Sequence, residues 1–187
     1  LTQAEHPLAA RVAPEGKVNA GLLDEEQMAA HGFAWYRTYG ESLRQLLAWG
    51  RRLESQDKLH EAERLTIQIG FGEYLAQMAG GIALSQVEVI RPADLGLGAD
   101  AVREFQIDAV ATLIAANSAD AKKRLGALLA DGTTLDPAYE DEMLTMMVEQ
   151  FDRFTAEKVV PYAHDWHLKD ELIPIEVIEE MADLGVF

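Results

Sequence analysis

The sequence contains no cysteine, and this absence removes several classes of chemistry at once. Without thiols there can be no disulfide framework, no thiolate nucleophile and no cysteine-based zinc or iron–sulfur site. The absence is compatible with a reducing compartment. Residues 1–7 also lack the basic and apolar regions of a secretory signal peptide, so we expect a cytoplasmic protein.

Basic residues are scarce as well. Sixteen Lys and Arg stand against 32 Asp and Glu, which gives a formal net charge of −16. A negative field of this size repels both a phosphate backbone and an anionic lipid surface, so we expect no nucleic-acid partner and no membrane partner. No apolar run approaches the ~20 residues that a membrane-spanning helix needs.

What the sequence does contain is enough apolar surface for a core. Of its 187 residues, 49% are hydrophobic and 26% are charged, which is typical of a globular protein of one ordinary domain or two small ones. The chain begins with Leu1 and ends in the apolar residues 184–187. From these two ends we expect it to be part of a longer polypeptide.

Apolar residues recur every three to four positions through most of the chain, and this spacing predicts helices. We expect helices at residues 24–53, 60–89, 100–117 and 118–129, one from 136 to a kink or end at Pro161, and a last one at 173–184. Asp24 and Asp136 are the expected N-caps of the first and fifth of these. Only residues 87–90 resemble a strand, so the expected fold class is all-α.

The same pattern suggests a division of the chain. Residues 1–23 mix proline and glycine with isolated apolar positions, which favours an extended N-terminal arm. Residues 24–135 form the expected helical extension, and residues 136–187 the segment after it. The expected boundary is Thr133–Leu135.

Three patterns have both a chemical and a structural interpretation, and we favour the structural one for each. Residues 96–101 fit G-x-G-x-x-A, but no strand leads directly into them, so we interpret them as a glycine-rich turn. None of the five histidines follows a glutamate by three positions, which argues against a di-iron site. His164 and His167 beside Asp165 could ligate a metal, but we interpret them as polar residues flanking a packed Trp166.

The remaining residues offer no further chemistry. Trp35 and Trp49 are interpreted as packing residues, and no serine lies in a nucleophile-elbow context. The acidic runs 170–171 and 179–180 are interpreted as solvated faces. Residue chemistry alone therefore names no catalytic, cofactor-binding or metal-binding residue.

The C-terminal segment does resemble a known family. Residues 151–161, FDRFTAEKVVP, resemble the first helix of the acyl-CoA dehydrogenase N-terminal domain. Trp166-His167, Leu172-Ile173-Pro174 and residues 176–187 resemble that family's second helix. Residues 70–92 resemble the N-terminal extension of one subgroup of the family, the (2S)-methylsuccinyl-CoA dehydrogenases. The resemblance implies a helical bundle extension followed by the first helices of the family's N-terminal helical domain.

This resemblance also implies an activity, the FAD-dependent desaturation of an acyl-CoA thioester, and for the subgroup the oxidation of (2S)-methylsuccinyl-CoA to mesaconyl-CoA. In the family a glutamate removes the α-proton, the β-hydride passes to flavin N5, and the electrons go to an electron-transfer flavoprotein. The base and most flavin contacts of the family lie in later domains, so no residue here is assigned a catalytic or FAD-binding role. The resemblance further implies a homo-oligomer, a dimer or tetramer.

Two alternatives to this reading stay open. One keeps the enzyme family but uses another branched or short acyl-CoA. The other is a free-standing acidic helical adaptor that binds a partner through an apolar helix face. Expression of residues 1–187 alone distinguishes the adaptor, which should be soluble and monodisperse, from part of an enzyme, which should expose an apolar face and aggregate.

Overall fold

The computed structural model describes residues 2–186, and the chain divides after Ala138 into two compact units, Leu1–Ala138 (unit 1) and Tyr139–Phe187 (unit 2). Helices make up most of both units, and the only sheet among the described residues joins two strands of two residues each. The fold class is all-α, as the spacing of apolar residues predicted.

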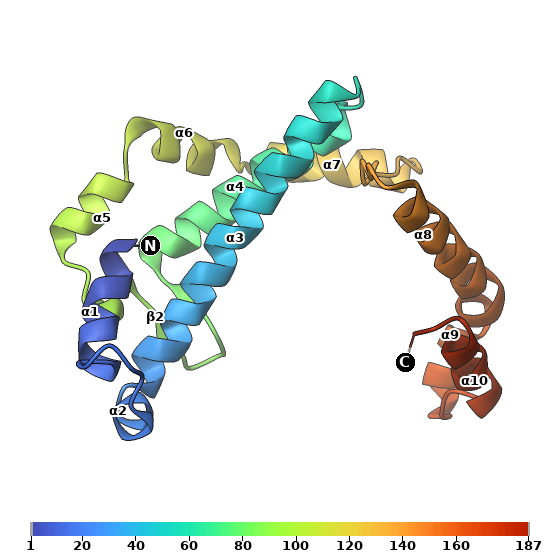
Figure 1. Cartoon of the computed structure of the whole chain (residues 1–187). Helices are drawn as coiled ribbons and strands as arrows, with labels where there is room; N and C mark the ends of the chain where they lie inside the picture. Colours follow the sequence, from blue (N-terminus) through green and yellow to red (C-terminus); the bar gives the residue numbers. More distant parts are fainter. Residues whose placement is uncertain (1, 187) are drawn as a thin grey trace. The chain divides into compact units, whose positions relative to one another are not determined.

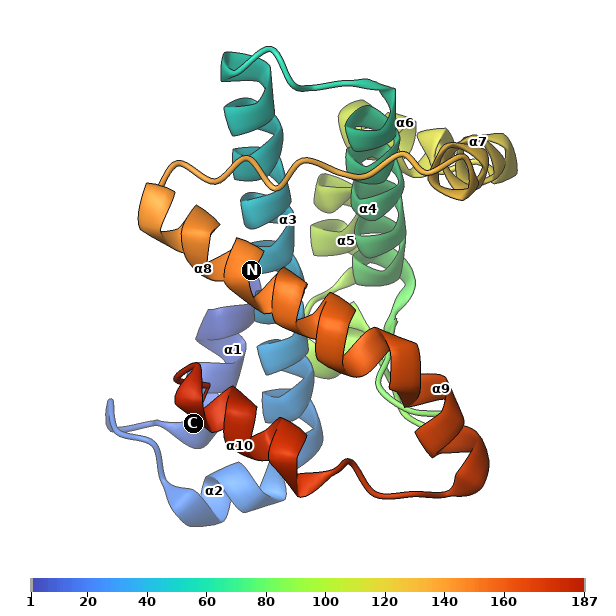
Figure 2. The same cartoon turned by 90° about the vertical axis from the view of Figure 1, so that its right-hand side faces the viewer.

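Unit 1 is built around a pair of antiparallel helices, α3 and α4, which run side by side in Figures 1 and 2. The helices of this unit are α1 (Thr2–Val12), α2 (Ala20–Glu25), α3 (Gln27–Ser55), α4 (Glu61–Gly80), α5 (Ala99–Phe105), α6 (Asp108–Ala116) and α7 (Ala119–Ala130). Between α4 and α5 lie strands β1 (Ile82–Ala83) and β2 (Val89–Ile90) and a 3-10 turn, η1 (Pro92–Leu95). Helices α6 and α7 pack on α4.

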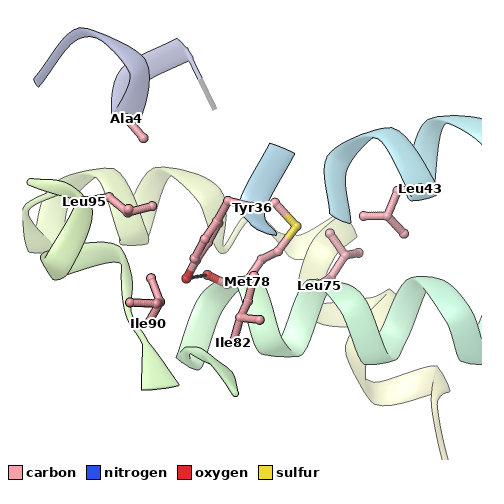
Figure 3. Close-up of a cluster of buried hydrophobic side chains, with 8 residues drawn as sticks. All are labelled: Ala4, Tyr36, Leu43, Leu75, Met78, Ile82, Ile90 and Leu95. Atoms are coloured by element: carbon pink, nitrogen blue, oxygen red, sulfur yellow. Dashed lines mark hydrogen bonds between the residues drawn. The ribbon is translucent and has the colours of Figure 1, made fainter. Parts of the chain in front are cut away.

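The core of unit 1 lies where α1, α3, α4, the strand pair and η1 meet (Figure 3). Its buried members are Ala4, Tyr36, Leu43, Leu75, Met78, Ile82, Ile90 and Leu95. The hydroxyl of Tyr36 donates a hydrogen bond of 3.1 Å to the backbone oxygen of Met78, so its one polar atom is satisfied. Burial, with a smaller contribution from the charge of Asp94, raises the pKa of Tyr36 to about 12.

The extended arm predicted for residues 1–23 is wrong, because α1 and the start of α2 occupy most of it. Ala4, Leu8 and Val12 are spaced by four residues and are buried, so one face of α1 covers the core. Pro7 lies in the interior of α1, where it has no N–H to donate to the carbonyl four residues earlier, but the helix continues through it.

The predicted helix 24–53 begins differently from expectation. Helix α2 precedes it and is capped by Asn19, whose side-chain oxygen accepts a hydrogen bond of 3.1 Å from the backbone nitrogen of Leu22. Asp24 does not cap a helix; its carboxylate accepts a hydrogen bond of 3.2 Å from the side chain of Gln27. Asn19 therefore caps a separate short helix, and α3 begins after Glu26 without a side-chain cap.

The predicted helix 60–89 ends nine residues early, at Gly80. Gly81 has a φ of 132°, which only glycine adopts without strain, and the chain reverses into the β1–β2 pair. The strand-like pattern noted at residues 87–90 is therefore partly real. The predicted helix 100–117 is also divided, because Gln106 and Ile107 leave the helical conformation between α5 and α6.

The helix predicted to start at Asp136 is wrong as well. Residues 133–141 are irregular, and α8 starts at Glu142. Asp141 is its N-cap, with a carboxylate that accepts hydrogen bonds of 2.8 and 3.2 Å from the backbone nitrogens of Met143 and Leu144. The carboxylate of Asp136 instead faces unit 1, where it pairs with Lys58.

Unit 2 consists of α8 (Glu142–Phe154), a π-helical turn η2 (Thr155–Val159), α9 (Val160–Lys169) and α10 (Ile175–Asp183). Figure 2 shows α8, η2 and α9 as one continuous rod. Pro161, which has no N–H and whose ring would crowd the carbonyl four residues earlier, lies just after the wide turn. Of the two outcomes predicted at Pro161, a kink or an end, the end is wrong, because α9 continues through Pro161 to Lys169.

Candidate functional site

The most distinctive surface of unit 2 is apolar and uncovered. None of residues 139–186 is buried. Several of its large apolar side chains are more than one-third exposed to solvent, namely Tyr139, Met143, Leu144, Met146, Met147, Val160, Tyr162, Leu168, Leu172, Ile173, Ile175 and Val186. We call these twelve residues the apolar surface of unit 2.

The spacing of residues on α10 explains how such a surface arises. Ile175, Ile178 and Met181 recur every three positions and so lie along one side of the helix. The intervening residues include Glu176 and Glu179, which lie on another side. Helix α8 has the same character, with methionines at its exposed positions. Both helices are amphipathic, which is the pattern of helices that pack on a neighbour.

One ion pair links η2 to α10 within unit 2. The Nζ atom of Lys158 in η2 lies 3.0 Å from Oε1 of Glu180 in α10. Beside this pair is a shallow groove of about 330 Å³, lined by Gln150, Arg153, Phe154, Glu157, Lys158, Glu180, Asp183 and Leu184. Because both side chains of the pair are 45% exposed, it contributes little stability.

A helical segment of this size needs more burial than unit 2 has. Small folded domains are marginally stable, because they bury a smaller fraction of their surface than large ones do. The sequence has no cysteine, and residues 139–186 include no buried side chain. A large exposed apolar surface on such a segment is typical of a surface that binds another molecule.

Of the glycine-rich residues 96–101, residues 96–98 form the turn interpreted from the sequence, and residues 99–101 begin α5. The turn follows η1, and Gly96 has a φ of 77°. A Cβ atom at Gly96 would lie 3.1 Å from Cβ of Pro7, so α1 fills the space above the turn. This packing leaves no room for a pyrophosphate on the turn.

The histidines of α9 do not gather other ligands. His164 and His167 are exposed, and Asp165 lies 3.6 Å from the ammonium of Lys169. Within residues 2–186 no group of three or more His, Asp or Glu side chains could hold a metal ion. No helix among these residues is long and apolar enough to cross a membrane.

The comparisons with known proteins bear on both units. Residues 141–187 match the family described as "Acyl-CoA dehydrogenase, N-terminal domain". Over 188 aligned residues, the chain is 47% identical to a protein of Cereibacter sphaeroides named (2S)-methylsuccinyl-CoA dehydrogenase. This match covers 98% of the chain. The chain is therefore similar to part of an acyl-CoA dehydrogenase. It spans about a third, 34%, of the length of that relative.

The two matches confirm the resemblance identified from the sequence. The family match begins at Asp141, the N-cap of α8, so the apolar surface lies almost entirely within the acyl-CoA dehydrogenase N-terminal domain segment. The match to the relative extends through unit 1 as well. Unit 1 is therefore a feature that this chain shares with that relative.

Two side-chain groups of unit 1 were not predicted from the sequence. The first is a row of rings on α3 and α4, in which Tyr39 stacks on Tyr74 with centroids 4.3 Å apart and Trp35 meets Tyr39 edge-on. Burial, and then the neighbouring Tyr74, raise the pKa of Tyr39. The row joins residues more than thirty positions apart, so no local pattern could have indicated it.

The second group consists of side chains that bind the irregular residues after α7. The indole nitrogen of Trp49 donates a hydrogen bond of 2.9 Å to the backbone oxygen of Asp136. Trp49 therefore has a specific structural role beyond packing. Trp35, in contrast, donates its indole hydrogen bond within α3, to Nε2 of His31 at 3.0 Å.

Proposed function

We propose that this chain is the N-terminal part of an FAD-dependent acyl-CoA dehydrogenase whose substrate is (2S)-methylsuccinyl-CoA. The proposed reaction removes one hydrogen from each of the α and β carbons of the acyl group and gives mesaconyl-CoA. The proposed acceptor of the electrons, after the flavin, is an electron-transfer flavoprotein.

The observation that carries this proposal is the extent of the identity. The family match covers residues 141–187 only, whereas 47% identity to the Cereibacter sphaeroides protein extends over 98% of the chain. A shared N-terminal unit in addition to the shared family domain supports the same subgroup, and hence the same substrate. The printed name of that relative supplies the substrate.

The residues of this chain support the reaction indirectly. We assign no flavin contact to the glycine turn at Gly96, because Pro7 fills the space there and no strand among the described residues leads into it. We propose that flavin and thioester are held by the parts of the enzyme that correspond to the other two-thirds of the relative. The role proposed for unit 2 is to pack its apolar surface on those parts and so cover the acyl-CoA-binding region.

The assembly and location follow the same proposal. We propose a homo-oligomer, since apolar helix faces of this kind serve subunit contacts as well as contacts between domains. The proposed location is the cytoplasm, where acyl-CoA and an electron-transfer flavoprotein would both be available.

The test uses the full-length protein that contains this chain. After purification, its visible spectrum should show the blue absorption of bound oxidised flavin. Addition of (2S)-methylsuccinyl-CoA under anaerobic conditions should bleach that absorption, and the product should be mesaconyl-CoA by mass and retention time.

The control compares substrates on the same enzyme. Butyryl-CoA and isobutyryl-CoA, which lack the second carboxylate, should bleach the flavin far more slowly. Equal or faster bleaching by one of them would replace the proposed substrate but keep the reaction class. A colourless protein from which no flavin can be extracted would end the enzymatic proposal and favour the adaptor.

A further inference from the structure

The irregular segment after α7 is held on unit 1 at one point, around Asp136. Residues 133–141 have no regular secondary structure, and most of them are exposed. Ala138 is the exception, with only 1% of its surface exposed, and Asp136 is half-buried. A segment that is exposed on both sides of a buried residue is fixed at that residue.

All the polar groups of Asp136 have partners. Its backbone N–H donates to Oε1 of Glu63 at 3.2 Å, and its backbone oxygen accepts from the indole of Trp49 at 2.9 Å. One carboxylate oxygen lies 2.9 Å from Nζ of Lys58, and the other accepts from the backbone nitrogen of Ala138 at 2.7 Å. A residue with its backbone and its side chain both satisfied has little freedom to move.

A further contact secures the next residues. The guanidinium of Arg52 donates a hydrogen bond of 3.3 Å from Nε to the backbone oxygen of Ala138. Ala138 has a φ of 52°, a conformation that costs free energy for any residue except glycine and that the surrounding contacts must therefore impose. The partners come from three places, the last turns of α3, the loop after it and the first turn of α4.

Glu63 indicates that this part of α4 is adapted to receive the segment. It is a charged residue with only 3% of its surface exposed. Burial of a carboxylate is costly unless hydrogen bonds replace its water. The hydrogen bond to its Oε1 comes from Asp136, whereas Oε2 has no hydrogen-bond partner among the described residues.

We infer that Trp49, Arg52, Lys58 and Glu63 form a clamp that binds Asp136–Ala138 and fixes the point where the chain leaves the helical extension. The clamp leaves residues 139–141 as the whole span between unit 1 and the first turn of α8. Without it, the span would be the nine residues 133–141. The clamp is thus a positioning device for the acyl-CoA dehydrogenase segment, and it does not depend on which acyl-CoA is the substrate.

Hydrogen–deuterium exchange on the intact protein tests the clamp. Trp49→Phe keeps the ring and removes the indole donor, so the amides of Asp136 and Ala138 should exchange roughly threefold to tenfold faster, as expected for the loss of one hydrogen bond. Trp35→Phe is the matched control, since it removes an indole donor from the same helix without a contact to the segment. Its exchange at residues 133–141 should equal that of the wild type.

Two outcomes decide the inference. Faster exchange at 133–141 in Trp49→Phe only, with unchanged exchange in the core peptides of α4, supports it. Equal exchange in both tryptophan variants and the wild type overturns it. If Trp49→Phe also loosens the core, Lys58→Met replaces it, because this half-exposed lysine contributes to the clamp and not to the core; unchanged exchange there overturns the inference equally.

Discussion

Gly72 and Gly126 offer the same substitution in two opposite settings. Gly72 is buried in α4 where α6 crosses it, and a Cβ atom there would lie 2.3 Å from Cβ of Asn117 and 2.8 Å from the backbone oxygen of Leu113. No real Cβ atom approaches other atoms so closely, and backbone cannot rotate away as a side chain can. Gly126 lies in α7 with nothing within 4 Å of its Cβ position.

The two alanine variants should therefore differ in sign. Alanine is favoured over glycine in a helix interior by about 1 kcal/mol. At Gly72 this gain is outweighed by overpacking, which costs about 1–3 kcal/mol and more where backbone must move, so Gly72→Ala should lower the unfolding free energy by about 1–2 kcal/mol. Gly126→Ala has no such cost and should raise it by about 0.5–1 kcal/mol.

Urea unfolding followed by tryptophan fluorescence measures both effects. A Trp166→Phe background leaves Trp35 and Trp49, which both lie on α3, as the reporters of unit 1. With a slope of about 2 kcal/mol per molar urea, the midpoint should fall by about 0.5–1 M for Gly72→Ala and rise by about 0.3–0.5 M for Gly126→Ala. A Gly72→Ala protein as stable as its parent would refute the close crossing of α4 and α6.

Three further predictions concern titration, capping and coverage. Because burial raises the pKa of Tyr36 to about 12, the unfolded chain loses that proton first as pH rises, so between pH 10 and 12 the unfolding free energy measured in urea should fall by about 2 kcal/mol more in the parent than in Tyr36→Phe. Asp141→Ala should cost about 1 kcal/mol and speed amide exchange in the first turn of α8, with unchanged exchange contradicting the cap. In the full-length enzyme, Ile175→Asp should lower the yield of flavin-loaded protein several-fold, whereas Val87→Asp should not; equal yields would mean that solvent, not protein, covers α10.

Much of the helical content was predictable because each helix carries its own periodic pattern. The fourth predicted helix, 118–129, agrees closely with α7, since Ser118 is its N-cap and accepts a hydrogen bond from the backbone nitrogen of Ala121. In this case the cap, the apolar spacing and the final glycine all lie within one stretch of sequence. Local information is then sufficient.

The errors occur where a distant contact decides between local options. Asp136 before Pro137 is a good helix start, but Lys58 and Trp49 bind Asp136 in another conformation, and both are more than seventy positions away. The β1–β2 pair is too short for any alternation to show, and its position depends on the φ of Gly81. Tertiary contacts override local preference at such points.

The candidate site also has parts that the sequence predicts and parts that only the fold reveals. The amphipathic pattern of residues 142–184 and the family resemblance are both legible in the sequence, because they consist of residue types at fixed spacing. The clamp cannot be predicted from the sequence, because Glu63 and Arg52 have the residue types of ordinary surface positions on two helices. Only the fold brings them to the segment that they hold.

The wide turn at Thr155–Val159 has a geometric consequence for the rod that contains it. An extra residue in one turn rotates everything that follows by about 100° around the helix axis. The side chains of α9, including the stacked pair Tyr162 and Trp166, thus leave the line that the methionines of α8 would have extended. A single helical rod can in this way present side chains to two neighbouring surfaces that lie in different directions. Deletion of one residue from the turn would bring the methionines of α8 and the aromatic pair of α9 back onto one side of the rod.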